Sequence, residues 1–155
     1  MIQIVKKMLA PIDFSAYSMA ALRDAWELTN DFKADLHLVH VVAPIFTIIE
    51  RGRELAREAA MVEQAESELL RIKKAEFSDS SRVTTAVLVG PPVPKLIDYA
   101  KEQAINLIAL ATHGRTGAEH LLIGSVAEKL VRLASCSVLV LPTHLRPGCV
   151  GASGR

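Results

Sequence analysis

A twenty-residue stretch, ATHGRTGAEHLLIGSVAEKL at 111–130, gathers glycines, hydroxyl groups, a histidine and an arginine. Its three glycines are Gly114, Gly117 and Gly124. Glycines allow a ligand to approach the backbone closely, and successive N–H groups can then bind phosphate oxygens. Arg115 adds a cation, and Ser125 begins a segment with a helical pattern, whose N-terminus favours anions. The residue types therefore indicate binding of a phosphate or polyphosphate.

A second interpretation of the same stretch needs no ligand. The glycine spacing matches neither G-x-G-x-x-G nor G-x-x-x-x-G-K-[ST], the two generic nucleotide loops. Ser125 and Glu128 form the pattern S-x-x-E, which predicts a capping box at the start of a helix. Gly114 could simply turn the chain out of a strand. Spacing alone leaves both interpretations open, so the surrounding elements must decide between them.

Strand and helix patterns alternate along the chain. Apolar runs predict five strands, at 2–10, 35–42, 82–90, 105–111 and 137–142. Helical spacing of apolar residues predicts four helices, at 14–32, 49–76, 91–103 and 126–134. This order predicts an α/β fold, an open, Rossmann-like parallel sheet of five strands with helices on both faces.

Ligands of such a sheet bind beyond the carboxyl ends of the strands. Four segments reach that edge in the predicted fold: 11–15, 41–44, 90–92 and 111–117. The glycine-rich stretch is one of them, which favours the phosphate interpretation.

The second predicted helix is long and charged. Its apolar stripe consists of Leu55, Ala59, Val62, Ala65, Leu69 and Ile72. We expect the charged remainder to be a solvated face; a partner-binding helix is the alternative.

The bulk composition excludes several classes of protein. The chain has 155 residues, enough for one domain, and its net charge of +1 gives no reason to expect nucleic acid or an anionic membrane as a partner. Its apolar runs are shorter than the roughly 20 residues of a membrane helix. Cys136 and Cys149 form no Cys-x-x-Cys pattern, so we expect free thiols and a cytoplasmic location.

The chain resembles the universal stress protein family in three separated motifs. The nucleotide-binding branch of that family carries G-x2-G-x9-G-[ST], and here Gly114 and the Gly124–Ser125 pair match it, with Ala111 in place of the first glycine. MLAPIDFSAYSMAAL resembles the family's first strand and helix, and LHLVHVV and INLIALATHG resemble its second and fourth strands. The resemblance covers residues 1–142.

The resemblance implies an adenine nucleotide site and a role for each residue. Asp13 would bind the ribose or adenosine end, Pro11 and Ile12 would line the adenine pocket, and the Val41 backbone would meet the adenine edge. The segment that would wrap the ribose and phosphates contains Ala111, Thr112, His113, Gly114, Arg115 and Gly117. The residues that would hold the β- and γ-phosphates are Gly124, Ser125 and Val126.

The resemblance also implies a sheet order of 3-2-1-4-5 and a homodimer through the strand 137–142. We expect residues 1–143 to form the nucleotide-binding domain and 144–155 a disordered tail. The expected cofactor is ATP, with Mg²⁺ or Mn²⁺ bridging its phosphates and no metal site made by protein ligands alone.

Three functional hypotheses follow. The first is an ATP-binding, homodimeric stress or regulatory module with an unidentified protein partner. The second is a slow, metal-assisted ATP hydrolase in which His113 acts as a base; the alternative for His113 is a loop residue near the ligand. The third is a structural dimer that binds no nucleotide, in which Asp13 only begins a helix ahead of Ser15.

Overall fold

The computed structural model describes residues 4–43, 51–113 and 123–142, without the side chains of 51–56. The strands are β1 (Lys7–Pro11), β2 (Asp35–Val42), β3 (Val83–Val89), β4 (Leu107–Ala111) and β5 (Ser137–Leu141). The helices are α1 (Ala16–Phe32), α2 (Arg51–Glu76), α3 (Pro92–Glu102) and α4 (Ser125–Leu133), with a 3-10 turn, η1 (Ser80–Arg82), before β3.

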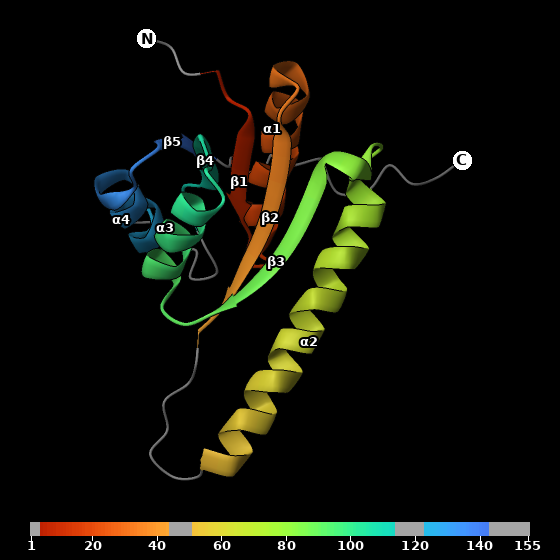
Figure 1. Cartoon of the computed structure of the whole chain (residues 1–155), viewed down its shortest axis with the longest axis vertical. Helices are drawn as coiled ribbons and strands as arrows, with labels where there is room; N and C mark the ends of the chain where they lie inside the picture. The colour runs from red at the N-terminus through yellow and green to blue at the C-terminus, as the bar shows by residue number, and fades with distance from the viewer. Residues whose placement is uncertain (1–3, 44–50, 114–122, 143–155) are drawn as a thin grey trace.

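The strands form one parallel sheet in the order β3-β2-β1-β4-β5 (Figure 1). The predicted order and strand direction are confirmed. β1 lies in the middle, and the chain reverses direction across the sheet between β1 and β4. The carboxyl ends of β1 and β4 therefore lie side by side, where ligands bind in open sheets of this kind.

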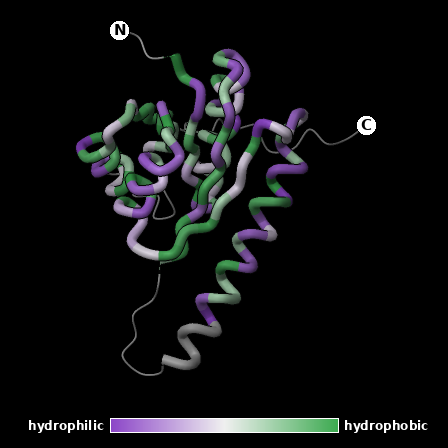
Figure 2. Tube along the Cα trace, in the orientation of Figure 1, coloured by the Kyte–Doolittle hydropathy of each residue, from purple (hydrophilic) through white to green (hydrophobic). Residues whose placement is uncertain are grey.

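Helices cover both faces of the sheet, and each face has its own apolar core. Met8, Leu36 and Leu38 face α1 and α2, whereas the alternate residues Leu9 and Val39 face α3 and α4. All five of these side chains are fully buried. Burial on both faces explains why all residues of β4 are apolar and why hydrophobic residues predominate in the strands, with hydrophilic positions between them (Figure 2).

Two strands, β1 and β4, begin at least two residues later than their apolar runs predict. Residues 4–6 of the predicted strand 2–10 are not in β1, and the Lys6 amide donates to the Asn106 side chain at 2.9 Å, as does the Lys7 amide at the start of the strand. Ile105 lies ahead of β4 because its amide donates to Ala100 O at the end of α3. In both places a backbone amide bonds to a group outside the sheet, and hydropathy alone does not predict such bonds.

Only part of the predicted apolar stripe of α2 is buried against the rest of the protein. Ala65, Leu69 and Ile72 are buried, Val62 is half-buried and Ala59 is exposed. The reason is visible in Figure 1, where the N-terminal half of α2 extends beyond the end of β3. No helix among the described residues, α2 included, is both long and apolar enough to cross a membrane.

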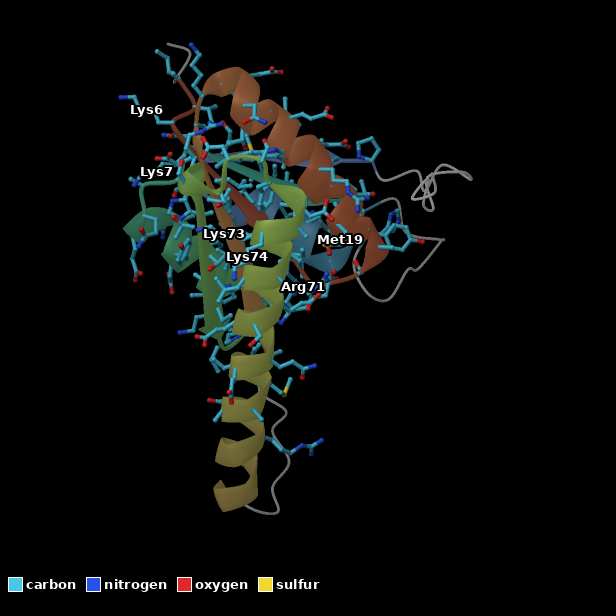
Figure 3. All side chains as sticks on the ribbon, turned by 90° about the vertical axis from the view of Figure 1, so that its right-hand side faces the viewer. Lys6, Lys7, Met19, Arg71, Lys73 and Lys74 are labelled. Atoms are coloured by element: carbon cyan, nitrogen blue, oxygen red, sulfur yellow. The ribbon has the colours of Figure 1, made fainter. Side chains whose placement is uncertain are left out.

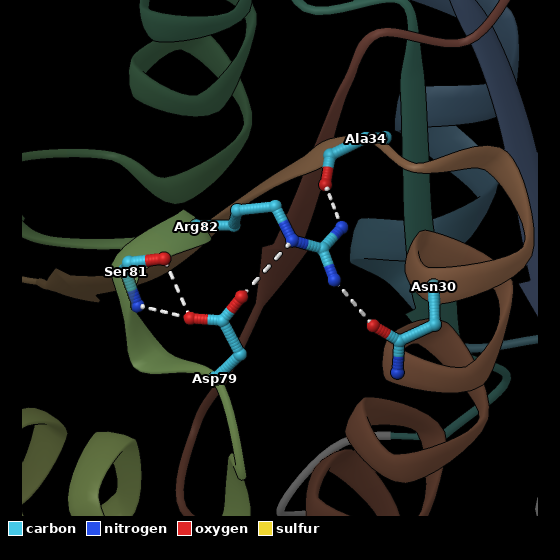
Figure 4. Close-up of polar contacts among 5 residues, drawn as sticks. All are labelled: Asn30, Ala34, Asp79, Ser81 and Arg82. Carbon is cyan, nitrogen blue, oxygen red and sulfur yellow. Dashed lines mark hydrogen bonds and ion pairs between the residues drawn. The ribbon is translucent and has the colours of Figure 1, made fainter.

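The amino edge of the sheet is closed by polar contacts. Arg82 donates to Ala34 O at 2.9 Å and to Asn30 Oδ1 at 2.6 Å, and it lies 3.6 Å from Asp79 (Figure 4). Its guanidinium also lies over the Trp26 ring, 5.4 Å from the ring centroid. These contacts join the start of β3 to the end of α1. Lys6 and Lys7 lie at the same end of the molecule, far from the free end of α2 (Figure 3).

Candidate functional site

A cavity of about 300 Å³ opens at the carboxyl edge of the sheet. Its walls come from the ends of β1, β2 and β4 and from the first turns of α3 and α4. The residues that line it are Pro11, Ile12, Asp13, Ser18, Val39, His40, Val41, Pro92, Leu96, Leu110, Ala111, Thr112, His113, Gly124, Ser125, Val126 and Ala127. The volume is at the lower end of the range found for small-molecule sites.

The turn after β1 brings a carboxylate to this cavity. Asp13 is half-buried, and its Oδ1 accepts a hydrogen bond from the Ser15 amide at 3.0 Å. Ser15 is the N-cap of α1, and its hydroxyl accepts from the Ser18 amide. Asp13 therefore supports the helix start, as the alternative hypothesis expects, and it also borders the cavity.

The apolar wall of the cavity consists of side chains that the sequence analysis did not select. Val39, Leu96, Leu110 and Ala127 are all buried, and Pro92 is half-buried at the start of α3. Together with Ile12 and Val41 they form a surface that suits a flat, apolar ring.

The connection from β4 to α4 supplies the polar side. The Gly124 amide donates to Thr112 O at 2.6 Å, which brings the two ends of this connection together. Ala111, Thr112 and His113 border the cavity from β4, and Gly124, Ser125 and Val126 border it from α4. Backbone amides in the first turn of a helix lack intrahelical acceptors, so this side of the cavity suits an anion.

The predicted capping box is wrong. Gly124, with ψ 158°, is the N-cap of α4, and it has no side-chain cap bond. Ser125 is the first helical residue and is exposed, and Glu128 lies 3.6 Å from Arg132. The extended backbone that a cap requires falls one residue earlier than the S-x-x-E pattern indicates.

His113 lies at the cavity with two identified neighbours. Its Nδ1 is 3.0 Å from Thr112 Oγ1, and its ring centroid is 6.0 Å from that of Tyr17. Its assignment as a base stays a prediction. Within the described parts of the chain, no group of three His, Cys, Asp or Glu residues could hold a metal ion.

Three groups outside the cavity lining have shifted pKa values. Burial, reinforced by Lys7, lowers the pKa of His37, whose Nδ1 lies 2.9 Å from the Tyr99 hydroxyl. Burial also raises the pKa of Tyr99 and of the Cys136 thiol. None of these groups is an activated nucleophile for chemistry in the cavity.

Ten of the thirteen predicted site residues line this one cavity, although they come from three separate segments of the chain. The other three, Gly114, Arg115 and Gly117, lie outside the described residues. Seven lining residues were not among the predicted site residues, although one of them, Pro92, lies in the segment 90–92 that was expected at this edge: Ser18, Val39, His40, Pro92, Leu96, Leu110 and Ala127. His40 alternates with Val39 and Val41 in the sequence, as a packed strand residue does, and it is 9% exposed.

Comparison with known proteins supplies independent findings. The family model described as the universal stress protein family matches residues 5–142. The universal stress protein MJ0531 of Methanocaldococcus jannaschii is 29% identical over 140 residues, which cover 89% of this chain and 82% of that protein.

Solved structures agree on the fold. The universal stress protein UspA from Lactobacillus plantarum superposes with a TM-score of 0.80 at 24% identity, over 90% of this chain and 99% of that one. A universal stress protein crystallised in complex with cAMP superposes with a TM-score of 0.64 at 20% identity, over 92% of this chain and all of that one.

Proposed function

The chain belongs to the universal stress protein family, and on that premise we propose that it binds ATP in the cavity at the carboxyl edge of its sheet. Binding would change its partners or its oligomeric state, as in a regulatory module of a stress response. We place the protein in the cytoplasm, with residues 1–143 as the nucleotide-binding domain and 144–155 as a tail. Neither nucleic acid nor a membrane is part of the proposal.

One observation carries the proposal. Residues chosen from the sequence for an adenine nucleotide converge on a single cavity with an apolar wall and a polar side. The apolar wall suits the base, Asp13 suits the ribose hydroxyls, and the first turn of α4 suits the phosphates. The cAMP complex supports the proposal as an example of this fold with an adenine nucleotide bound.

A divalent ion would be held mainly by the nucleotide. Mg²⁺ prefers oxygen ligands and usually keeps several waters, so phosphate oxygens with one or two protein groups suffice. Ser125 borders the cavity at the first turn of α4, and its hydroxyl fits this limited role. When bound, the ion would neutralise charge on the phosphates.

We also propose a homodimer through β5. Among the described strands β5 pairs only with β4, so its other edge is available for pairing. Its residues from Val138 to Leu141 are half-buried, and Val131 and Leu133 nearby in the sequence are more than half exposed. A two-fold pairing would remove an apolar strand edge from solvent. Size-exclusion chromatography with light scattering tests it; the mass of one chain would contradict the dimer.

Slow ATP hydrolysis is the second candidate, because His113 borders the cavity and its Nδ1 is close to the Thr112 hydroxyl. Incubation of the protein with ATP and Mg²⁺ or Mn²⁺ distinguishes it from a binding module. Turnover that disappears in His113→Ala while ATP affinity is retained would favour the hydrolase.

The decisive test of nucleotide binding has two steps. Nucleotide that co-purifies with the protein is released and identified, and calorimetry then compares ATP, ADP, AMP and cyclic nucleotides. We expect ATP to bind most tightly. No binding of any of them at millimolar concentration would contradict the proposal and favour the structural dimer.

A further inference from the structure

The turn between β1 and α1 contains a strained residue. Phe14 has φ 64°, in the left-handed region that aromatic side chains rarely occupy. Such a conformation is strained and persists only where neighbouring groups hold it. This residue directly follows Asp13, so the same turn fixes the direction of the cavity carboxylate.

His40 contacts the turn at two points. Its Nδ1 lies 2.7 Å from Ile12 O, and because a carbonyl oxygen only accepts, Nδ1 carries the hydrogen and donates it. Its ring packs against the Phe14 ring, with centroids 4.5 Å apart and planes inclined by 33°. The preceding residue of β2 adds a third contact, since Ile12 N donates to Val39 O at 2.8 Å.

We propose that His40 is a positioning residue for the nucleotide site: it holds the turn from Ile12 to Phe14 so that Asp13 presents its carboxylate to the ribose. The inference rests on the proposed function. An apolar residue at position 40 would fill the space but would leave the buried Ile12 carbonyl without this donor. The turn would then lose the contact that holds its strained residue in place.

The ligand test compares ATP with 2′,3′-dideoxy-ATP, which lacks both ribose hydroxyls. Asp13→Ala and His40→Phe should each weaken ATP binding about tenfold, which is the effect of losing roughly 1.4 kcal/mol. Both should change dideoxy-ATP binding less than about twofold. His40→Asn, whose amide nitrogen can donate from nearly the position of Nδ1, should restore most of the preference for ATP.

His37→Phe is the matched control. This histidine is also buried on β2, but it contacts Tyr99 and faces α3. Its replacement should lower stability and leave the ratio of the two affinities unchanged. An unchanged ratio in His40→Phe, or a ratio that changes equally in His37→Phe, would overturn the inference.

A second variant tests the strain directly. Glycine adopts φ 64° without steric cost, so a turn carrying Phe14→Gly depends less on His40. His40→Phe should therefore weaken ATP binding less in the Phe14→Gly background than in the wild type. Strict additivity of the two changes would contradict the role of His40 in holding this backbone conformation.

The last measurement needs no nucleotide. The Ser15 amide donates to Asp13 Oδ1, so its hydrogen exchange reports whether the turn is intact. Exchange should accelerate in His40→Phe and return toward the wild-type rate in His40→Asn. Unchanged exchange would overturn the inference even if ATP binds. If the wild-type protein binds no ATP, the proposed function and the ribose role fail together, and Ser15 exchange still decides whether His40 holds the turn.

Discussion

Polar residues lie at both edges of the sheet, but they are used differently. At the amino edge Asn106 accepts from two backbone amides, and Arg82 donates to Ala34 O and Asn30. At the carboxyl edge Asp13, Thr112 and Ser125 border a cavity. In a parallel sheet, helix N-termini meet the strands at the carboxyl edge, so unpaired amides gather there.

From this difference we expect the amino edge to contribute mainly to stability and the carboxyl edge mainly to ligand binding. Contacts that close the amino edge should contribute to the free energy of unfolding and have no effect on a ligand. Polar groups at the phosphate side of the cavity, such as Ser125, should contribute to ligand affinity and little to folding. Single substitutions at each edge can test this separation.

The largest expected effect is at the carboxyl edge. Gly124→Val places a branched side chain where the first turn of α4 meets the cavity. We expect ATP binding to weaken about 100-fold, roughly 2.7 kcal/mol, because the phosphates can no longer approach the amides. Calorimetry measures the affinity, and thermal unfolding should show the domain still folded. Lys129→Val, on the exposed side of α4, is the control; normal ATP binding by Gly124→Val would contradict the phosphate site.

The second effect is at the opposite edge. Asn106→Leu removes the acceptor of the Lys6 and Lys7 amides, both at 2.9 Å. We expect the free energy of unfolding to fall by about 1–3 kcal/mol, the usual effect of leaving such donors without a partner. Urea unfolding measures this loss, and ATP affinity of the folded protein should be unchanged. If Asn106→Leu lowers ATP affinity but not stability, the assignment of stability to the amino edge and of binding to the carboxyl edge is wrong.

Much of the carboxyl edge could be predicted from the sequence. The alternation of elements determines which segments reach that edge, and Asp13, Val41 and Thr112 lie in three of them. The sheet order was also predicted, through the family resemblance. The segments at this edge depend on the local hydrophobic pattern and on the order of the elements along the chain, both of which can be read from a single sequence.

The wall of the cavity could not be predicted in the same way. Leu96 and Ala127 have the apolar spacing of ordinary core residues, and only the packing of α3 and α4 on the sheet exposes them to a cavity. His40 has the alternation of a strand residue, and its role depends on Ile12, which is 28 positions away. The N-cap of α4 was misplaced by one residue, because the S-x-x-E pattern does not report backbone angles.

A smaller effect separates folding from binding at a single side chain. Ser125→Ala should change the free energy of unfolding by less than about 0.5 kcal/mol, because Ser125 is not the N-cap. ATP binding should weaken about threefold to tenfold, the loss expected when one hydrogen bond of ordinary strength is removed. Urea unfolding and calorimetry on the same preparation measure both. A loss of stability near 1 kcal/mol would restore the capping interpretation.

The smallest expected effect is the pH dependence of stability that His37 contributes. Burial and Lys7 lower its pKa in the folded protein, so below the ordinary histidine value of about 6.5 the unfolded chain binds more protons than the folded one. The free energy of unfolding should therefore fall as the pH decreases from 7 through that value. His37→Gln, which can still bond to the Tyr99 hydroxyl, should show a shallower decrease in urea unfolding between pH 7 and pH 5. An equal decrease in both proteins would assign the pH dependence to other groups. Because His37 does not line the cavity, its replacement should leave ATP affinity at pH 7 unchanged, as expected for a group that acts on folding alone.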